Sequence, residues 1–171
     1  MSLLIFAQRK LDIARQKSDV SYRLMQLSQK LMDLQQYAAN IADGSISMSD
    51  MMNTPGSMFG RQLIYMNYAH NAAILGAQQQ MGLLQPQIQM QMSQMNPQYQ
   101  MMYQQWIFRS LYEQQRQQAN QQEQKLLNEQ EKQIQAEKGK LETQLKLLEQ
   151  EYEAAKQGEE AGIKQMKPEY A

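Results

Sequence analysis

The chain of 171 residues is long enough for one domain, or for a small domain with an extended arm. Gly and Pro are few, at eight and four, Val occurs once and Thr twice, so the frequent turns and the enrichment in β-branched residues that are typical of strands are missing. We therefore expect an all-α fold. Basic and acidic side chains balance at 17 each, which gives no general reason to expect nucleic acid or a membrane surface as a partner.

Three further absences narrow the possible functions and locations. The sequence has no Cys, which leaves no disulfide, thiolate metal site or thiol nucleophile. No stretch approaches the ~20 apolar residues that cross a bilayer, so no membrane span is expected. The first residues lack the basic start and long apolar core of a signal peptide, which makes a cytoplasmic location the default. An assembled extracellular or virion structure is left open.

The charges are unevenly placed along the chain. Residues 1–42 carry six basic and three acidic side chains, residues 43–122 carry only six charges, and residues 123–171 carry eight basic and eleven acidic ones. The positive excess of the first segment is too small to make nucleic acid an expected partner, and association through it is the weakest hypothesis. The basic residues that would carry it are Arg9, Lys10, Arg15, Lys17, Arg23 and Lys30.

Residues 3–42 contain neither Gly nor Pro and are predicted to form one long helix. In the second half, apolar residues recur at alternating steps of three and four, which is the spacing of a heptad seam. A second apolar row makes the face wider than a two-stranded seam needs, so we expect packing against more than one helix. The seam consists of Leu24, Leu27, Leu31, Leu34, Ala38 and Ile41, and the second row of Leu4, Leu11, Met25 and Met32.

Residues 43–57 interrupt the helical pattern and are predicted to be a connector. Gly44 is expected to close the first helix in the left-handed conformation. Ser47 or Ser49 can cap a short helical turn, and the following "TPG" predicts another turn. Because the connector is long enough to support a hairpin, residues 1–98 are predicted to form a helical hairpin body.

The sequence "NIAD", which ends at Asp43, and "TPG", which begins at Thr54, together resemble a turn after the first helix of flagellar rod and hook proteins. Those proteins also pair their helical termini. In this chain Asp43 stands where they have a second Asn, ten residues separate it from Thr54, and their C-terminal signature is absent. The resemblance covers about a tenth of the chain. It implies a secreted filament, and no family is assigned from it.

Residues 58–84 are predicted to form a second helix with one side of small residues. Small side chains four residues apart allow two helix backbones to approach closely. We expect this side to pack against the first helix. The small residues are Ala69, Ala72, Ala73, Gly76 and Ala77.

The segment 85–106 reads "QPQIQMQMSQMNPQYQMMYQQW", with five Met, nine Gln and no charged residue. Such a sequence can be disordered and prone to aggregation, and its Met residues can also line the chain's own core. Gln and Met favour helix, and Pro86 and Pro97 both suit a first helical turn, so we expect either continuous helix or helix with a break near Asn96. Since large exposed apolar surfaces usually mark interfaces, we interpret the segment as a helical surface buried mainly by another subunit. Its predicted contact residues are Met90, Met92, Met95, Met101, Met102 and Trp106.

Residues 99–157 are predicted to form a long, coiled-coil-like C-terminal helix that extends as an arm. One apolar residue recurs every seven positions, but the companion row is apolar only near its end, so the seam is weak. Asn120 falls on this seam and would suit the specification of register or oligomer state. Residues 158–171 are expected to be a frayed tail. The seam consists of Leu127, Ile134, Leu141, Leu148 and Ala155.

No motif for catalysis, a cofactor or a metal ion stands out. His70 is the only His, and its neighbours Ala, Asn and Tyr do not supply the nucleophile and orienting partner that a general base needs. Asp43, Ser45 and Ser47 match the first places of a calcium loop, but the Gly and the closing Glu of such a loop are absent. We therefore expect a protein that is not an enzyme and that needs no cofactor.

Two functional hypotheses follow. The first is a structural protein that self-assembles through helix packing into a homo-oligomeric filament, virion or secretion-apparatus component. The second is a helical adaptor, scaffold or chaperone-like protein that binds a partner helix through its Met/Gln-rich surface. In the first hypothesis the subunit contacts are the leucine seam of the first helix, the seam of the arm, and the Met/Gln segment.

Overall fold

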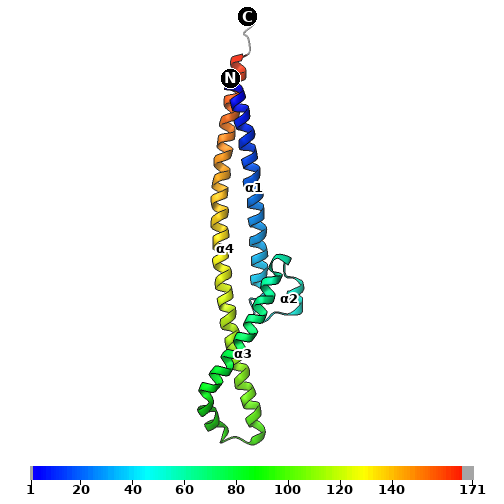
Figure 1. Cartoon of the computed structure of the whole chain (residues 1–171), viewed down its shortest axis with the longest axis vertical. Helices are drawn as coiled ribbons and strands as arrows, with labels where there is room; N and C mark the ends of the chain where they lie inside the picture. The colour runs from blue at the N-terminus through cyan, green and yellow to red at the C-terminus, as the bar shows by residue number, and fades with distance from the viewer. Residues whose placement is uncertain (1, 167–171) are drawn as a thin grey trace. The chain divides into compact units, whose positions relative to one another are not determined.

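The computed structural model describes residues 2–166, and that part of the chain contains four helices (Figure 1). They are α1 (Ser2–Asn40), α2 (Met48–Met52), α3 (Gly56–Met92) and α4 (Pro97–Met166). No strand occurs among the same residues. The predicted all-α fold with a long C-terminal helix is therefore confirmed. None of these four helices is both long and apolar enough to cross a membrane.

The chain divides into two compact units, which we describe separately. The terminal unit contains Met1–Met32 and Lys132–Ala171, and the central unit contains Asp33–Glu131. This division differs from the predicted body at residues 1–98 and arm at residues 99–157. The difference arises because the last part of α4 packs against the first part of α1, so the two ends of the sequence form one unit.

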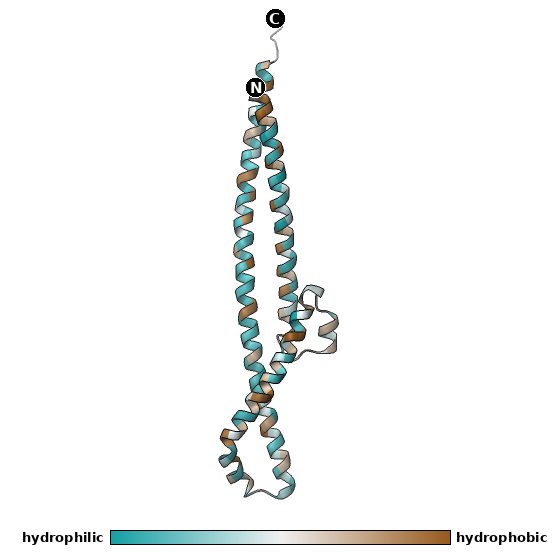
Figure 2. Ribbon diagram, in the orientation of Figure 1, coloured by the Kyte–Doolittle hydropathy of each residue, from teal (hydrophilic) through white to brown (hydrophobic). Residues whose placement is uncertain are grey.

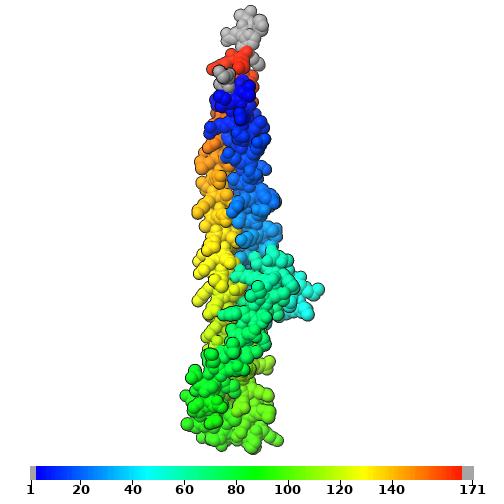
Figure 3. Space-filling view, viewed as in Figure 1, coloured from blue at the N-terminus to red at the C-terminus, as the bar shows by residue number. Residues whose placement is uncertain are grey.

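In the terminal unit the first part of α1 and the last part of α4 lie side by side and antiparallel (Figures 1 and 3), and the core is a row of apolar residues on each. Ile13 and Val20 of α1 are buried in one cluster with Leu148 and Ala155 of α4. The residues of each pair are seven apart, which places them on the same face of their helix. Figure 2 shows apolar residues recurring along both helices with hydrophilic residues between them. Partly buried around the cluster are Leu24, Leu141, Leu145 and Tyr152.

Ion pairs flank this core and join basic residues of α1 to acidic residues of α4. Exposed pairs contribute only about 0.2–1 kcal/mol each, and one of the four pairs, Lys10–Glu159, is half-buried. The signs of all four favour pairing of a basic N-terminal segment with an acidic C-terminal one. Four of the six basic residues considered above for nucleic-acid association are engaged in this way, which lowers the positive potential of the segment. The pairs are Arg9–Glu151 at 3.5 Å, Lys10–Glu159 at 2.6 Å, Lys17–Glu149 at 3.7 Å and Arg23–Glu137 at 2.7 Å.

The end of α4 is helical as far as Met166. Residues 158–166 are thus helical where a frayed tail was expected, and residues 167–171 lie outside the described residues. Packing against α1 explains this order. The ring of Phe6 lies so close to Gly158 that a Cβ atom at that glycine would be 2.8 Å from it. Gly158 therefore allows a close approach between the helices instead of ending α4.

In the central unit, residues 41–55 lead the chain from α1 back to the start of α3. Gly44 has a φ of 72°, the left-handed conformation expected after the first helix. Ser47, one of the two serines predicted to cap a helical turn, caps α2 through a reciprocal capping box with Asp50. Asn40 donates hydrogen bonds to the carbonyl of Asp50 and to the hydroxyl of Thr54, at 3.2 and 3.0 Å. These bonds fix the connector to the end of α1.

α3 runs in the same direction as the end of α1, and both are antiparallel to α4. Ser57 donates a hydrogen bond to Asp33, and four residues further on Arg61 lies over the ring of Tyr37, so residue numbers rise together along α1 and α3. The hairpin of the central unit is consequently formed by α3 and α4, with the end of α1 beside it. The antiparallel contacts are Tyr65 with Asn120, His70 with Tyr112 and Gln91 with Tyr103.

The small side of α3 makes a close contact with α4, whereas we expected it to pack against the first helix. Gly76 lies so near α4 that an added Cβ atom would be 2.7 Å from Oε1 of Gln115. Ala69, Ala73 and Ala77 on the same side are fully buried. Beyond Gly76 the two helices diverge and rejoin at the turn of residues 93–96 (Figure 1).

The Met/Gln segment is helical on both sides of this turn. Of the two predicted alternatives, the structure has the helix with a break near Asn96, and Pro97 is the first residue of α4. Pro86 was expected in a first turn but lies inside α3. Its fixed φ is compatible with a helix, and its lack of an N–H removes one backbone hydrogen bond. The Gln and Met residues around it favour helix and carry α3 through this position.

Candidate assembly surface

Residues 62–108 form the longest part of the chain without Lys, Arg, Asp or Glu. They comprise most of α3, the following turn and the first turns of α4. Figure 2 shows apolar and hydrophilic residues mixed along both helices. Contacts of such a surface depend on its shape, on the apolar area that is buried, and on amide hydrogen bonds instead of ion pairs.

Side-chain hydrogen bonds fix the turn between α3 and α4. Nε2 of Gln100 donates to the carbonyls of Met92 and Met95, at 2.9 and 3.2 Å. The hydroxyl of Tyr103 donates to Oε1 of Gln91 on α3. These bonds hold the first turns of α4 against the end of α3, so the neighbouring apolar side chains are presented on a defined backbone.

A shallow groove of about 540 Å³ lies beside this turn, and we name it the tip groove. The rings of Tyr103 and Trp106 stack there, with centroids 6.1 Å apart and planes inclined by 18°. Trp106 is 63% exposed and Met102 is 64% exposed. Trp is highly buried on average, and it is among the residues most enriched at energetically important positions of protein interfaces. The tip groove is lined by Met95, Asn96, Tyr99, Met102, Tyr103 and Trp106.

A second concavity, of about 450 Å³, lies between α3 and α4 where the helices diverge, and we name it the inner hollow. Its apolar walls come from Met81, Ile88, Met92 and Phe108, and four glutamines and Gly82 complete the lining. No charged side chain lines it. The inner hollow is thus suited to apolar or amide-bearing groups.

The six predicted Met/Gln contact residues lie on both sides of the turn. Met92 lines the inner hollow, whereas Met95, Met102 and Trp106 line the tip groove. Tyr99 and Tyr103 complete the groove and were not among the predicted contact residues. Their positions, seven and three residues before Trp106, place all three rings on one helix face, which is the signal that could have identified them. Two further predicted residues, Met90 and Met101, are exposed nearby in the same segment.

Unlike the exposed residues of the Met/Gln segment, the predicted seam residues are buried or half-buried within the chain. Leu34 and Leu127 are each 1% exposed, and Leu148 is 7% exposed. A side chain that is already buried has no surface to offer to a second subunit. The structure therefore gives these residues an intrachain role in place of the predicted subunit contacts. The remaining seam residues are Leu27, Ile41, Ile134 and Ala155, which are buried, and Leu24, Leu31, Ala38 and Leu141, which are half-buried.

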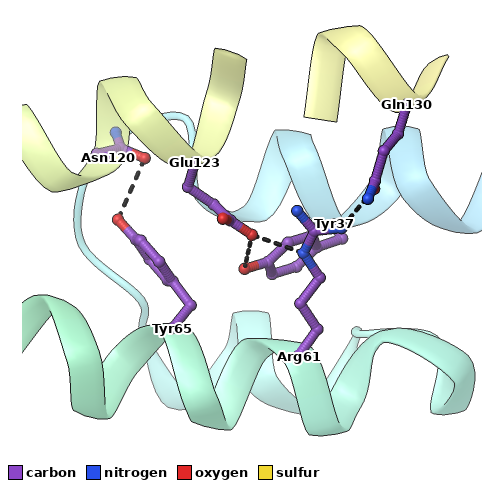
Figure 4. Close-up of polar contacts among 6 residues, drawn as sticks. All are labelled: Tyr37, Arg61, Tyr65, Asn120, Glu123 and Gln130. Atoms are coloured by element: carbon purple, nitrogen blue, oxygen red, sulfur yellow. Dashed lines mark hydrogen bonds and ion pairs between the residues drawn. The ribbon is translucent and has the colours of Figure 1, made fainter. Parts of the chain in front are cut away.

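The central unit also contains a polar cluster to which α1, α3 and α4 contribute (Figure 4). Oε1 of Glu123 accepts hydrogen bonds from Nε of Arg61 at 2.6 Å and from the hydroxyl of Tyr37 at 3.2 Å. Arg61 also donates to Oε1 of Gln130 at 2.5 Å. Burial, together with the negative charge of Glu123, raises the pKa of Tyr37 far above its ordinary value. No pattern in the sequence indicates this cluster, because its members are brought together only by the packing of three helices.

Two buried polar residues of the same region differ in how they are satisfied. Oδ1 of Asn120 accepts a hydrogen bond from the hydroxyl of Tyr65 at 3.3 Å (Figure 4). Asn120, which was predicted to specify register or oligomer state, is thus engaged within the chain. Gln62 is fully buried, and its amide has no hydrogen-bond partner among the described residues. An unsatisfied buried amide costs about 1–3 kcal/mol, so Gln62 lowers the stability of the central unit.

His70 contacts an aromatic residue on the neighbouring helix. Its Nδ1 lies 2.8 Å from the hydroxyl of Tyr112, and the two rings pack edge to face with centroids 5.8 Å apart. These contacts are those of a surface histidine that packs on its neighbour. Across residues 2–166, no group of three or more His, Asp or Glu side chains could hold a metal ion.

No protein-family model matches the chain, and the comparisons with curated proteins and with solved structures found no significant match. The functional conclusion therefore depends on the geometry described above.

Proposed function

We propose that the chain is a non-enzymatic structural subunit that self-assembles into a multi-subunit complex, such as a filament, a virion or a component of a secretion apparatus. The observation that carries this proposal is the tip groove. It presents exposed aromatic and Met side chains on a backbone that is fixed by its own hydrogen bonds. Exposed apolar surfaces of this kind usually mark contacts with another protein.

A second copy of the chain suits this surface as a partner. Residues 62–108 carry no Lys, Arg, Asp or Glu, so two copies can approach through them without like-charge repulsion. Gln side chains both donate and accept hydrogen bonds, which lets identical surfaces satisfy each other. Met adapts its shape to irregular surfaces, and Trp106 supplies a large apolar anchor.

The magnitudes favour an assembly with several contacts over a single pair. Burying a large apolar side chain contributes about 1.5–3 kcal/mol, whereas association costs about 4–15 kcal/mol of translational and rotational freedom. The few side chains of the tip groove offset this cost only in part. Stable complexes are expected when each subunit makes more than one contact.

The alternative function is that of a helical adaptor, scaffold or chaperone-like protein. The inner hollow is the observation that favours it, because its apolar and amide walls can receive side chains from a partner helix. In that case the purified chain would be a monomer or a small oligomer until its partner is added.

The proposal is tested by light scattering after size-exclusion chromatography, with electron microscopy of the same peak. We expect large, regular particles for the unmodified chain. The variant Met102→Glu/Trp106→Glu places two charges in the tip groove and should reduce these particles to small species. The control Gln114→Glu/Gln118→Glu adds the same charges to exposed positions further along α4 and should assemble normally.

One outcome would overturn the proposal, and another would overturn the tip groove as its contact. If the unmodified chain is a clean monomer at all concentrations, self-assembly is wrong and the adaptor function takes its place. If the tip variant forms the same particles as the unmodified chain, assembly occurs but the tip groove is not its contact.

A further inference from the structure

A second apolar face of α1 is left uncovered in the terminal unit. Leu4, Leu11, Met25 and Met32 are 76%, 61%, 62% and 56% exposed. Together with Ser18 they recur every seven residues, and we name them the outer row of α1. Four large side chains exposed along one face are too regular for scattered surface residues, because single exposed apolar residues normally lack such a pattern.

A row of small residues accompanies the outer row. Ala7, Ala14, Ser21 and Ser28 each lie three residues after a member of the outer row. The two rows together alternate at steps of three and four over residues 4–32, which is a complete heptad seam of nine positions. None of the nine residues is charged.

Each position of this second seam follows directly after a position of α1 that faces α4. The buried or half-buried residues Ile13, Val20 and Leu24 are followed directly by Ala14, Ser21 and Met25. One residue along an α-helix corresponds to a rotation of about 100°. The uncovered seam therefore faces a direction in which a further helix can pack beside α1 without displacing α4.

We infer that the uncovered seam of α1 pairs with the same seam of a second copy, antiparallel and across a two-fold axis. The inference rests on the proposed self-assembly and specifies one of its contacts. Side-chain size is the first argument for a second copy as the partner, because antiparallel pairing places large residues of one row opposite small residues of the other. Each layer of the contact consists of two facing residues, one from each copy. In the register that we assign, the numbers of these two residues add to 39. Its layers are Ala7 with Met32 of the second copy, Leu11 with Ser28, Ala14 with Met25 and Ser18 with Ser21, each occurring twice.

Charge is the second argument, and it selects this register over its neighbour. Arg15 flanks the uncovered seam on one side and Lys17 on the other. When the layers add to 39, Arg15 lies beside Tyr22 of the second copy, where a cation–π contact is available, and Lys17 lies beside Leu24. In the register shifted by one heptad, facing residues have numbers that add to 32. That register would place Arg15 beside Arg15 of the second copy and Lys17 beside Lys17 of the second copy. Like charges at such positions disfavour that register.

The inferred contact has a defined place in an assembly. Two terminal units paired in this way form a four-helix arrangement in which the two α1 helices lie between the two α4 segments. A two-fold contact by itself stops at a dimer. A tip contact of the same two-fold kind would link these dimers into an open chain, so the two surfaces together can build a filament.

The first test uses the tip variant Met102→Glu/Trp106→Glu as background, because blocking the tip should leave only the α1 contact. We expect a dimer in this background. Adding Leu11→Glu/Met25→Glu should halve the mass measured by light scattering, whereas the control pair Gln16→Glu/Gln26→Glu should leave a dimer. All four positions are exposed on α1, so circular dichroism should show unchanged helix content in both chains.

The second test reads the register directly, because the chain contains no Cys of its own. Under mild oxidation Ala14→Cys/Met25→Cys should form covalent dimers at least tenfold faster than Ala7→Cys/Met25→Cys, since a disulfide requires Cα atoms roughly 4.4–6.8 Å apart. The numbers of the first two positions add to 39, as in the assigned register, and those of the second two add to 32, as in the register shifted by one heptad. Single Met25→Cys chains should not cross-link, because only a parallel pair brings that position opposite itself.

The outcomes separate this inference from the proposed function. A monomeric tip variant, a dimer that survives Leu11→Glu/Met25→Glu, or faster cross-linking of Ala7→Cys/Met25→Cys would overturn the inferred pairing while leaving self-assembly in place. Failure of the unmodified chain to assemble would overturn the proposed function. If the tip variant stays large, the tip contact is wrong, and cross-linking still decides the pairing of α1.

Discussion

The hydroxyl of Tyr37 on α1 donates a hydrogen bond to Oε1 of Glu123 on α4, and the same oxygen accepts a hydrogen bond from Arg61 on α3. One carboxylate oxygen of α4 thus bonds to both of the other helices that meet in the central unit, α1 and α3 (Figure 4). Burial and the nearby negative charge raise the pKa of Tyr37, so the folded chain holds this phenol in its neutral form.

Stability should fall at alkaline pH because of Tyr37. In the unfolded chain a tyrosine loses its proton near pH 10, whereas the folded chain keeps it to higher pH. The stabilising contribution is therefore fully present below pH 10 and is lost above it, at up to about 1.4 kcal/mol per pH unit. Urea unfolding at pH 9, 10 and 11 should show this slope, and Tyr37→Phe should reduce it.

The control for this prediction is Tyr22→Phe, at an exposed position on α1. It should leave the pH slope unchanged. At neutral pH Tyr37→Phe should also cost about 1–3 kcal/mol of unfolding free energy, because Glu123 loses one of its hydrogen bonds. Equal slopes for the unmodified chain and Tyr37→Phe would show that this phenol does not control the alkaline transition.

Replacement of Gln62 by Leu should stabilise the chain by about 1–2 kcal/mol. The buried amide has no hydrogen-bond partner among the described residues, and Leu fills a similar volume without polar atoms. Chemical denaturation measures the change. Gln79→Leu, at an exposed position of the same helix, should change stability by less than about 0.5 kcal/mol. A loss of stability in Gln62→Leu would mean that the amide is satisfied in the folded protein.

Two glycines of α4 should respond oppositely to Ala. An added Cβ atom at Gly139 meets nothing within 4 Å, so Gly139→Ala should stabilise the helix by about 0.5–1 kcal/mol. At Gly158 the same atom would lie 2.8 Å from the ring of Phe6, and Gly158→Ala should lower the melting temperature. The double variant Gly158→Ala/Phe6→Leu should recover most of the loss. An increase in melting temperature for Gly158→Ala alone would show that α1 and α4 are not in close contact there.

Ile134→Asp combined with Leu141→Asp should disrupt the terminal unit itself. From the sequence alone this variant would separate paired arms of different subunits. With Ile134 buried and Leu141 packed against the core cluster, two charges instead enter the interior of one chain. We expect loss of helical circular dichroism and rapid proteolysis. Gln133→Asp/Gln144→Asp, at exposed positions of α4, should remain folded. A folded but smaller particle would restore the intersubunit role of the seam.

The heptad spacings of the sequence identify α1 and α4 and their apolar rows correctly, because each row depends only on local spacing. Which helix covers a row is a property of the whole fold. Leu148 was assigned to another subunit since nothing in its own segment indicates that Val20, far away in the sequence, lies against it. The complementary charges of the two ends are the one distant signal that could have suggested the pairing, as in Lys10–Glu159.

The candidate site was predictable only in part for the same reason. The uncharged Met/Gln composition identified the segment, and a break near Asn96 was one of the two alternatives predicted for it. The groove itself depends on how Tyr99, Tyr103 and Trp106 align on α4 beside the turn. The polar cluster around Glu123 could not be predicted, because isolated Tyr, Arg and Glu residues carry no local pattern.

The abundance of Met on the tip has a consequence for oxidation chemistry. The chain has fifteen Met and no Cys, so thioethers are its main sites of reversible oxidation. Met101 and Met102 are mostly exposed, and conversion to the sulfoxide would turn apolar contacts into polar ones. Peroxide would then dissolve an assembly held together by this surface, and methionine sulfoxide reductases would restore it.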